Sequence, residues 1–252
     1  MGAPRNMAQT EGAMSDDAAH RIPSSNDLVA AALDEARKDW MARTSAADTS
    51  PSGRLAAIFR DSGWSPRVDM NPNTGRPKDW CGMAVAAWFF RAGMNPLHRR
   101  SFWATANVRS FFSYGTAGRI HHRTATEVNL LRDSWVGIEA WHRCLRQTRR
   151  WVEGTKLHAM PLNEVTIAAG DVVLINHQGR VDGAHHIALV ETWDGCVLGT
   201  LEGNATGMDP EGRRLRQGVV RVERDLGKAD VRKTVFGIGR VSRWDWSKAR
   251  VR

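Results

Sequence analysis

A chain of 252 residues is long enough for one large domain or two small ones, and an apolar fraction of 42% is ordinary for a globular core. Its 36 basic and 27 acidic residues give a formal charge of +9, which favours nucleic acid, anionic lipid or the acidic polymers of a bacterial envelope as partner. The three widely spaced cysteines suit neither a disulfide framework nor a CxxC-type zinc site, and no apolar stretch reaches the length of a membrane span.

Residues 1–26 are rich in Ala, Ser, Asp, Asn and Met without periodicity, which predicts a flexible tail. This stretch also lacks the basic-then-apolar order of a signal peptide. We therefore expect synthesis in the cytoplasm, with action on the cell wall or periplasm after lysis or after delivery by a secretion or phage system.

Helical patterns follow the tail. Residues 26–43 begin with a capping residue and place apolar side chains at helical spacing, and a second helix is predicted in 53–63. The Pro, Asn and Gly content of the loop 64–79 argues against regular structure. In 80–93, WCGMAVAAWFFRAG is apolar nearly all round and ends in Gly, which predicts a buried helix, and another short helix is expected in 104–115.

The second half of the chain changes period. Residues 116–168 are strongly basic, with an amphipathic helix expected in 126–154, and we interpret them as an insertion or lid. Strands separated by Gly, Asp and Asn turns are predicted at 171–176, 185–192, 196–203, 218–224 and 235–243. Helices followed by an antiparallel sheet of about five or six strands predict an α+β fold, with 27–252 as a single domain that carries the insertion.

The candidate chemistry begins at Cys81, which opens the buried helix, where the positive end of the helix dipole favours a thiolate. A thiol nucleophile needs a base and a third group that orients the base, and the three can be far apart in sequence. The strand AHHIALVETWDG supplies His185 and His186, which must point to opposite faces. The next strand ends in LEGN, where Glu202 and Asn204 are two apart and should share a face.

The phrases DWCGMAVAAWFFRAG, GDVVLI, HIALVETWDG and LEGNATG resemble the cysteine, histidine-dependent amidohydrolase/peptidase (CHAP) family, which is allied to the NlpC-type papain-like peptidases. The resemblance covers roughly residues 50–243, with a gap over the basic insertion. It implies a papain-like fold with Cys81 as nucleophile and His186 as general base, because the family's strand runs from the base directly into apolar residues. Glu202 or Asn204 would orient the imidazole, and we rank Glu202 ahead.

Proteins of this family cleave amide bonds in bacterial peptidoglycan. The resemblance therefore implies an N-acetylmuramoyl-L-alanine amidase or a peptide-stem or cross-bridge endopeptidase, such as a phage endolysin or a secreted antibacterial effector. The alternatives are a papain-like cysteine protease or deamidase with a protein substrate, and a binding module that has lost activity. We expect a monomer without cofactor, metal or nucleic-acid partner, because no metal-ligand spacing and no nucleic-acid motif accompanies the histidines and the basic strings.

Overall fold

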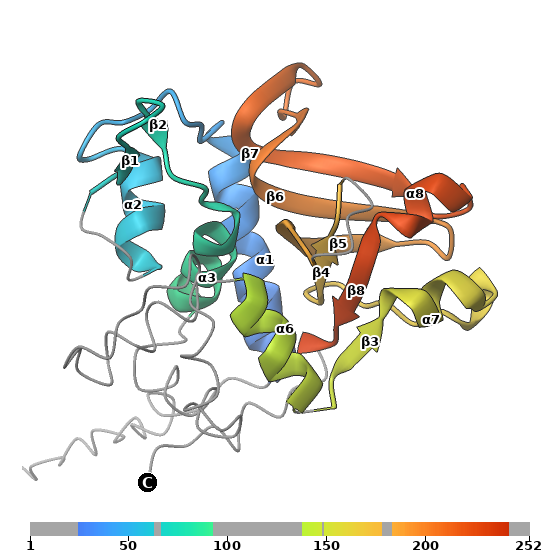
Figure 1. Ribbon diagram of the computed structural model, residues 1–252. Helices are drawn as coiled ribbons and strands as arrows, with labels where there is room; N and C mark the ends of the chain where they lie inside the picture. The colour runs from blue at the N-terminus through green and yellow to red at the C-terminus, as the bar shows by residue number, and fades with distance from the viewer. Residues whose placement is uncertain (1–24, 63–66, 93–137, 148, 178–182, 242–252) are drawn as a thin grey trace, which may run out of the picture.

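The computed structural model describes residues 25–62, 67–92, 138–147, 149–177 and 183–241. Within these residues the chain has an α+β fold built on a six-stranded antiparallel sheet, as the sequence predicts (Figure 1). The strands, in the order in which they pair, are β3 (Trp151–Glu153), β8 (Val235–Gly239), β4 (Val172–Ile175), β5 (His186–Trp193), β6 (Val197–Met208) and β7 (Arg214–Asp225).

Helices lie on both sides of this sheet, with α1, α2, α3 and α6 gathered on one side and α7 and α8 on the other (Figure 1). The helices are α1 (Ser25–Met41), α2 (Arg54–Asp61), α3 (Cys81–Arg91), α6 (Ile138–Gln147), α7 (Gly154–Ala159) and α8 (Ala229–Lys233), with a 3-10 turn η4 (Leu162–Glu164). The predicted order, helices first and most of the sheet second, is confirmed.

Both faces of the central strands are buried, so successive residues of β5 enter different parts of the core. Ile187 and Leu189 pack in the cluster that contains α1, α2 and α3. Ala188 and Val190 pack in a second cluster with Leu157 of α7. The sheet is therefore the middle layer of the described structure.

The helix α3 is buried on all sides over Cys81–Phe89, as its apolar composition predicts. It lies so close to β6 that a Cβ atom added at Gly203 would be 2.4 Å from the Cβ of Ala84. Only glycine fits at that position without a shift of the helix or the strand. The close approach places the start of α3 beside the residues of β6 that surround Gly203.

A buried carboxylate, Asp39 of α1, ties the N-terminal helices together. Its Oδ2 accepts hydrogen bonds from Nε1 of Trp88 at 3.0 Å and from Nη1 of Arg91 at 2.7 Å. Its Oδ1 accepts from Nη1 of Arg54 at 2.9 Å. Because a buried charge is tolerated when it is paired and hydrogen-bonded, this network holds α3 in a defined position on α1 and α2.

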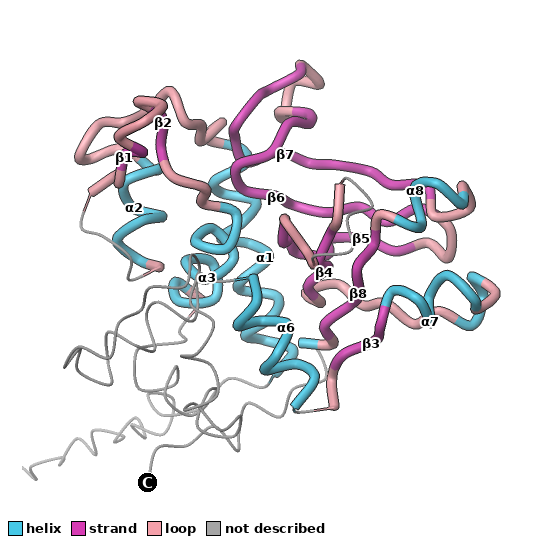
Figure 2. The backbone as a smooth tube through the Cα atoms, viewed as in Figure 1, coloured by secondary structure: helices cyan, strands magenta, loops and turns pink. Residues whose placement is uncertain are grey.

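The strands β6 and β7 continue beyond the rest of the sheet as a long hairpin that curves toward α1 (Figure 2). Nε1 of Trp40 donates to the backbone carbonyl of Met208 at 2.9 Å. The guanidinium carbon of Arg221 lies 4.1 Å from the centroid of the Trp40 ring. These contacts attach the end of α1 to the hairpin.

The strand β3 lies where the sequence predicts the end of a helix over 126–154, and that part of the prediction is wrong. The described helix α6 ends at Gln147, and Arg149 has a left-handed φ of 57°. Trp151 then pairs with Gly239 of β8, and its ring occupies the space where a Cβ on Gly237 would lie, at 2.1 Å. Gly237, which is distant in sequence from Trp151, thus makes room for the Trp151 ring of β3.

The loop that precedes α3 differs from its prediction. The loop 64–79 contains a small hairpin of β1 (Met70–Asn71) and β2 (Arg76–Pro77), which differs from the prediction of no regular structure. The hairpin forms because Oδ1 of Asn71 accepts from the backbone N–H of Asn73 at 2.9 Å, which closes an Asx turn. Among the described residues no helix is long and apolar enough to cross a membrane.

Several predicted segments lie outside the described residues: the tail, apart from residues 25 and 26, the short helix in 104–115, and residues 116–137 of the basic insertion. The described remainder of the insertion is built into the domain. Trp141 and Leu145 of α6 are fully buried in the first core cluster.

Candidate active site

Cys81 is the first residue of α3, directly after the fully buried Trp80. The N–H groups in the first turn of a helix have no acceptor within the helix, and together they give this end a partial positive charge. The side chain of Cys81 is a free thiol that is 6% exposed. Its placement at the start of a buried helix agrees with the sequence prediction.

The imidazole of His186 meets this thiol. His186 opens β5 and is buried, whereas the preceding His185 is exposed. The Cys81 side chain is close enough to the His186 ring to raise its pKa. The structure thus brings together the two residues that the sequence predicts as nucleophile and base, and it separates His186 from His185 as the pattern of opposite faces requires.

Glu202 of β6 is the residue that orients His186. Its carboxylate is 1% exposed, and Oε2 lies 2.9 Å from Nε2 of His186. Because Glu202 occupies Nε2, Nδ1 is the ring nitrogen left for the sulfur of Cys81. The three side chains form one buried chain of contacts from thiol to imidazole to carboxylate.

Asn204 takes another position, and the expectation that it shares a face with Glu202 is wrong. The pairing of β6 with β7 shifts between Glu202 and Ala205, and Asn204 has a left-handed φ of 56°. Its Nδ2 donates to Oδ1 of Asp79 at 3.2 Å. Strand alternation fails at such an irregularity, so Asn204 contacts the segment that leads into α3 instead of the imidazole.

Neighbouring charges and hydrogen bonds determine the pKa values of His186 and Glu202. Burial alone would lower the pKa of His186, but its hydrogen bonds to Cys81 and Glu202 raise that pKa to about 10. Burial alone would raise the pKa of Glu202, but the hydrogen bond to His186 and the positive charge of Arg224 lower it. At neutral pH the imidazole is therefore protonated and the Glu202 carboxylate ionised.

Sequence reasoning missed three residues around this chain of contacts. Oε1 of Glu202 accepts a hydrogen bond from Oγ1 of Thr200 at 2.6 Å and another from Nη1 of the buried Arg224. The ring of His177 lies 5.4 Å from that of His186, and burial together with the charge of His186 lowers the pKa of His177. Strand alternation could have placed Thr200 beside Glu202, but Arg224 belongs to another strand whose register the sequence leaves open.

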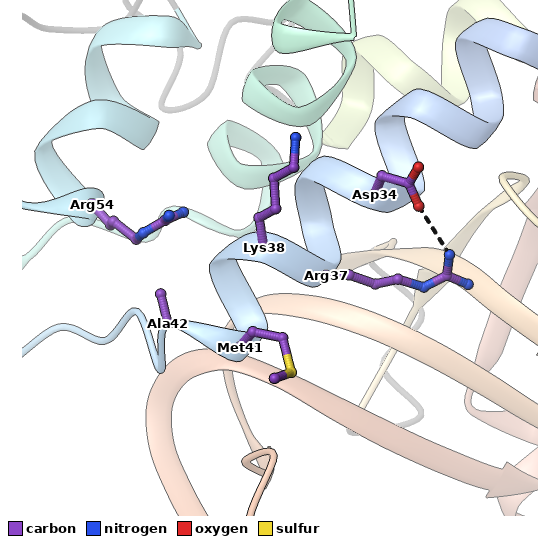
Figure 3. A pocket seen from close by; sticks show the side chains of 6 residues that line it. All are labelled: Asp34, Arg37, Lys38, Met41, Ala42 and Arg54. Carbon is purple, nitrogen blue, oxygen red and sulfur yellow. Dashed lines mark hydrogen bonds and ion pairs between the residues drawn. The ribbon is translucent and has the colours of Figure 1, made fainter.

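A separate surface hollow of about 600 Å³ lies along α1 (Figure 3). The residues that line it are Asp34, Arg37, Lys38, Met41, Ala42 and Arg54. Its basic side chains already have carboxylate partners, which are Glu191 for Arg37, Glu35 for Lys38 and Asp39 for Arg54. None of the residues in the Cys81 site lines this hollow, so we assign it no part in the chemistry.

Comparison with protein-family models, with curated proteins and with solved structures finds no match to this chain. The functional assignment therefore depends on the residues and the geometry of the chain itself. Among the described residues, no group of three or more His, Cys, Asp or Glu side chains could hold a metal ion. The arrangement at Cys81 suits nucleophilic chemistry by a thiolate.

Proposed function

We propose that this chain is a papain-like cysteine hydrolase of the CHAP type, with Cys81 as nucleophile and His186 as general acid and base. The observation that carries the proposal is the buried group in which the His186 ring hydrogen-bonds the carboxylate of Glu202 and has its pKa raised by the neighbouring thiol of Cys81. Nucleophile, base and orienting group in hydrogen-bond contact are the geometry that a thiol hydrolase requires.

The first chemical step would form a thioester. The Cys81 thiolate attacks the carbonyl carbon of an amide, and the oxygen takes up the negative charge. The backbone N–H of Cys81, at the start of α3, is one donor placed to stabilise that charge. When the carbon–nitrogen bond breaks, the His186 imidazolium gives its proton to the leaving amine.

The second step would release the acid. The now neutral His186 takes a proton from a water molecule, and the water oxygen bonds to the thioester carbon. The carbon–sulfur bond breaks, a carboxylic acid leaves, and the thiolate and imidazolium are restored. Glu202 holds the imidazole in place through both steps, because its bond to Nε2 leaves Nδ1 as the ring nitrogen free to exchange a proton.

The proposed substrate is an amide bond of bacterial peptidoglycan, either the N-acetylmuramoyl-L-alanine link or a bond of the peptide stem or cross-bridge. Two observations support this class: the resemblance of the phrases around Cys81, His186 and Glu202 to the CHAP family, and the formal charge of +9, which suits an anionic wall. On this proposal the protein is a phage endolysin or a secreted antibacterial effector that reaches the wall after lysis or delivery.

Digestion of purified sacculi tests the proposal. We expect the wild-type chain to release soluble fragments with new amino groups, and mass spectrometry of the fragments to identify the cleaved bond. Cys81→Ser is the matched negative control, because it removes the sulfur and keeps the shape. If sacculi stay intact after prolonged incubation and the chain cleaves or deamidates a protein substrate, the protease or deamidase alternative is correct and peptidoglycan is not the substrate.

A further inference from the structure

The carboxylate of Glu202 has different partners on its two oxygens. Oε2 contacts His186, while Oε1 accepts from Thr200 and from Nη1 of Arg224. A carboxylate held at both oxygens cannot rotate about its last bond without losing a hydrogen bond at each end. The orientation of His186 therefore depends on what holds Oε1.

Arg224 is built into the sheet at this point. It pairs with Leu198 in the register of β6 and β7, and alternate residues of β6 place Thr200 and Glu202 on the same face as Leu198. The Arg224 side chain is 9% exposed, and its Nη1 also donates to Oγ1 of Thr200 at 2.9 Å. The guanidinium thus runs along the sheet face toward the carboxylate.

The charges along this line alternate. A Cys81 thiolate, the His186 imidazolium, the Glu202 carboxylate and the Arg224 guanidinium would carry −, +, − and +, which sum to zero. An ionised carboxylate as buried as Glu202 is stable when a cation stays beside it. During the proposed reaction His186 gives up its proton, so a fixed cation is needed that remains when the imidazole is neutral.

We infer that Arg224 is a positioning residue for the proposed reaction, which keeps Glu202 ionised and aimed at Nε2 of His186. Thr200 serves the same purpose, because its hydroxyl links the guanidinium to Oε1 of Glu202. The inference rests on the proposed function for its consequence in hydrolysis, but its effect on the Cys81 thiol can be measured without any substrate.

The experiment compares Arg224→Met with Arg221→Met. Arg221 lies on the same strand and makes a two-point ion pair with the buried Glu191, at 2.7 and 2.8 Å, so its loss removes a similar pair outside the site. The rate of Cys81 alkylation by iodoacetamide is followed against pH by peptide mass spectrometry. We expect Arg224→Met to slow the alkylation of Cys81 by about tenfold at neutral pH, which corresponds to about 1.4 kcal/mol.

The control Arg221→Met should keep the wild-type profile. Arg224→Lys, which retains the charge, should recover part of the loss, and Thr200→Val should slow the alkylation of Cys81 by less than Arg224→Met does. Thr200→Val also provides the test if Arg224→Met does not fold. In a Glu202→Gln background, Arg224→Met should have no further effect on the profile, because Arg224 acts through Glu202.

Alkylation of Cys81 in Arg224→Met that is as fast as in Arg221→Met, or faster, would overturn the inference. So would an undiminished effect of Arg224→Met in the Glu202→Gln background. If the wild-type chain does not digest sacculi, the proposed substrate is wrong, but the alkylation result still tests the positioning role of Arg224. The two claims can therefore fail separately.

Discussion

Cys81 and Cys196 are both free thiols, but the charges around them are opposite. Cys81 is buried beside the ring of His186, which is protonated at neutral pH. Cys196 is exposed, and its Sγ donates to Oδ1 of Asp225 at 3.3 Å, a hydrogen bond that raises the pKa of Cys196. The comparison shows that the charge of the partner affects the ionisation of a thiol more than its exposure does. An imidazolium stabilises a thiolate, whereas a carboxylate favours the neutral thiol.

The largest effect that separates the two cysteines should be on hydrolysis. We expect Cys81→Ala to lower kcat/KM for the digested substrate by about a thousandfold or more, because the proposed nucleophile is lost. Cys196→Ala should stay within about twofold of the wild type, since its thiol bonds Asp225 and touches none of the site residues. Comparable losses in both variants would remove the distinction between the two thiols.

A second difference should appear in the titration of His186, followed by NMR of the labelled imidazole. The wild-type pKa should lie near 10, and Cys81→Ala should lower it, because the bond to Cys81 raises it while burial lowers it. Cys196→Ala is the control and should leave the titration unchanged. A wild-type midpoint close to 6.5 would contradict the thiol contact.

The same shift has a consequence for stability. The folded-state pKa of His186 exceeds its ordinary value of 6.5, so protonation of His186 stabilises the folded chain fully below about pH 6.5. That contribution should be lost as the pH rises from 6.5 toward 10. Urea unfolding of the wild type and of His186→Gln across this range measures it, and the difference between their unfolding free energies should narrow with rising pH.

The smallest expected effect concerns two glycines, Gly203 beside the helix that begins at Cys81 and Gly227 beside Cys196. Gly203→Ala would place a Cβ 2.4 Å from Ala84 of the buried helix α3, and we expect it to lower the unfolding free energy by about 1–3 kcal/mol. Gly227→Ala would meet the exposed side chains of Asp225 and Cys196, which can move, so its effect should be below about 0.5 kcal/mol. Denaturant unfolding of both variants gives the comparison, and equal losses would show that α3 yields more easily than its packing indicates.

The parts of the molecule that the sequence predicts are those with a local pattern. The buried helix that begins at Cys81 follows from apolar residues all round, and the strand that carries His186 follows from the run of apolar residues after it. Between the adjacent histidines, alternation together with the resemblance selected the one that contacts the thiol. Glu202 was also found in this way, two residues from an alternative that the pattern could not separate.

The parts that escaped prediction depend on contacts between distant segments. Asn204 does not share a face with Glu202, because a register shift in β6 interrupts the alternation of side chains. Short sequence patterns do not reveal such a shift. The strand at Trp151 requires space at Gly237, which the local helical pattern around Trp151 cannot reveal. Arg224 reaches Glu202 only through the register of β7 against β6. In each case tertiary pairing overrides the local signal.

The pH profile of alkylation at the two described cysteines tests the central claim most directly. Wild-type chain is treated with iodoacetamide at a series of pH values, and peptide mass spectrometry follows Cys81 and Cys196 in the same sample. Cys81 should be alkylated faster than Cys196 at neutral pH, because the His186 imidazolium stabilises a thiolate, whereas the hydrogen bond to Asp225 raises the pKa of Cys196. Equal alkylation rates for the two cysteines at neutral pH, or faster alkylation of Cys196, would contradict the thiolate–imidazolium pair.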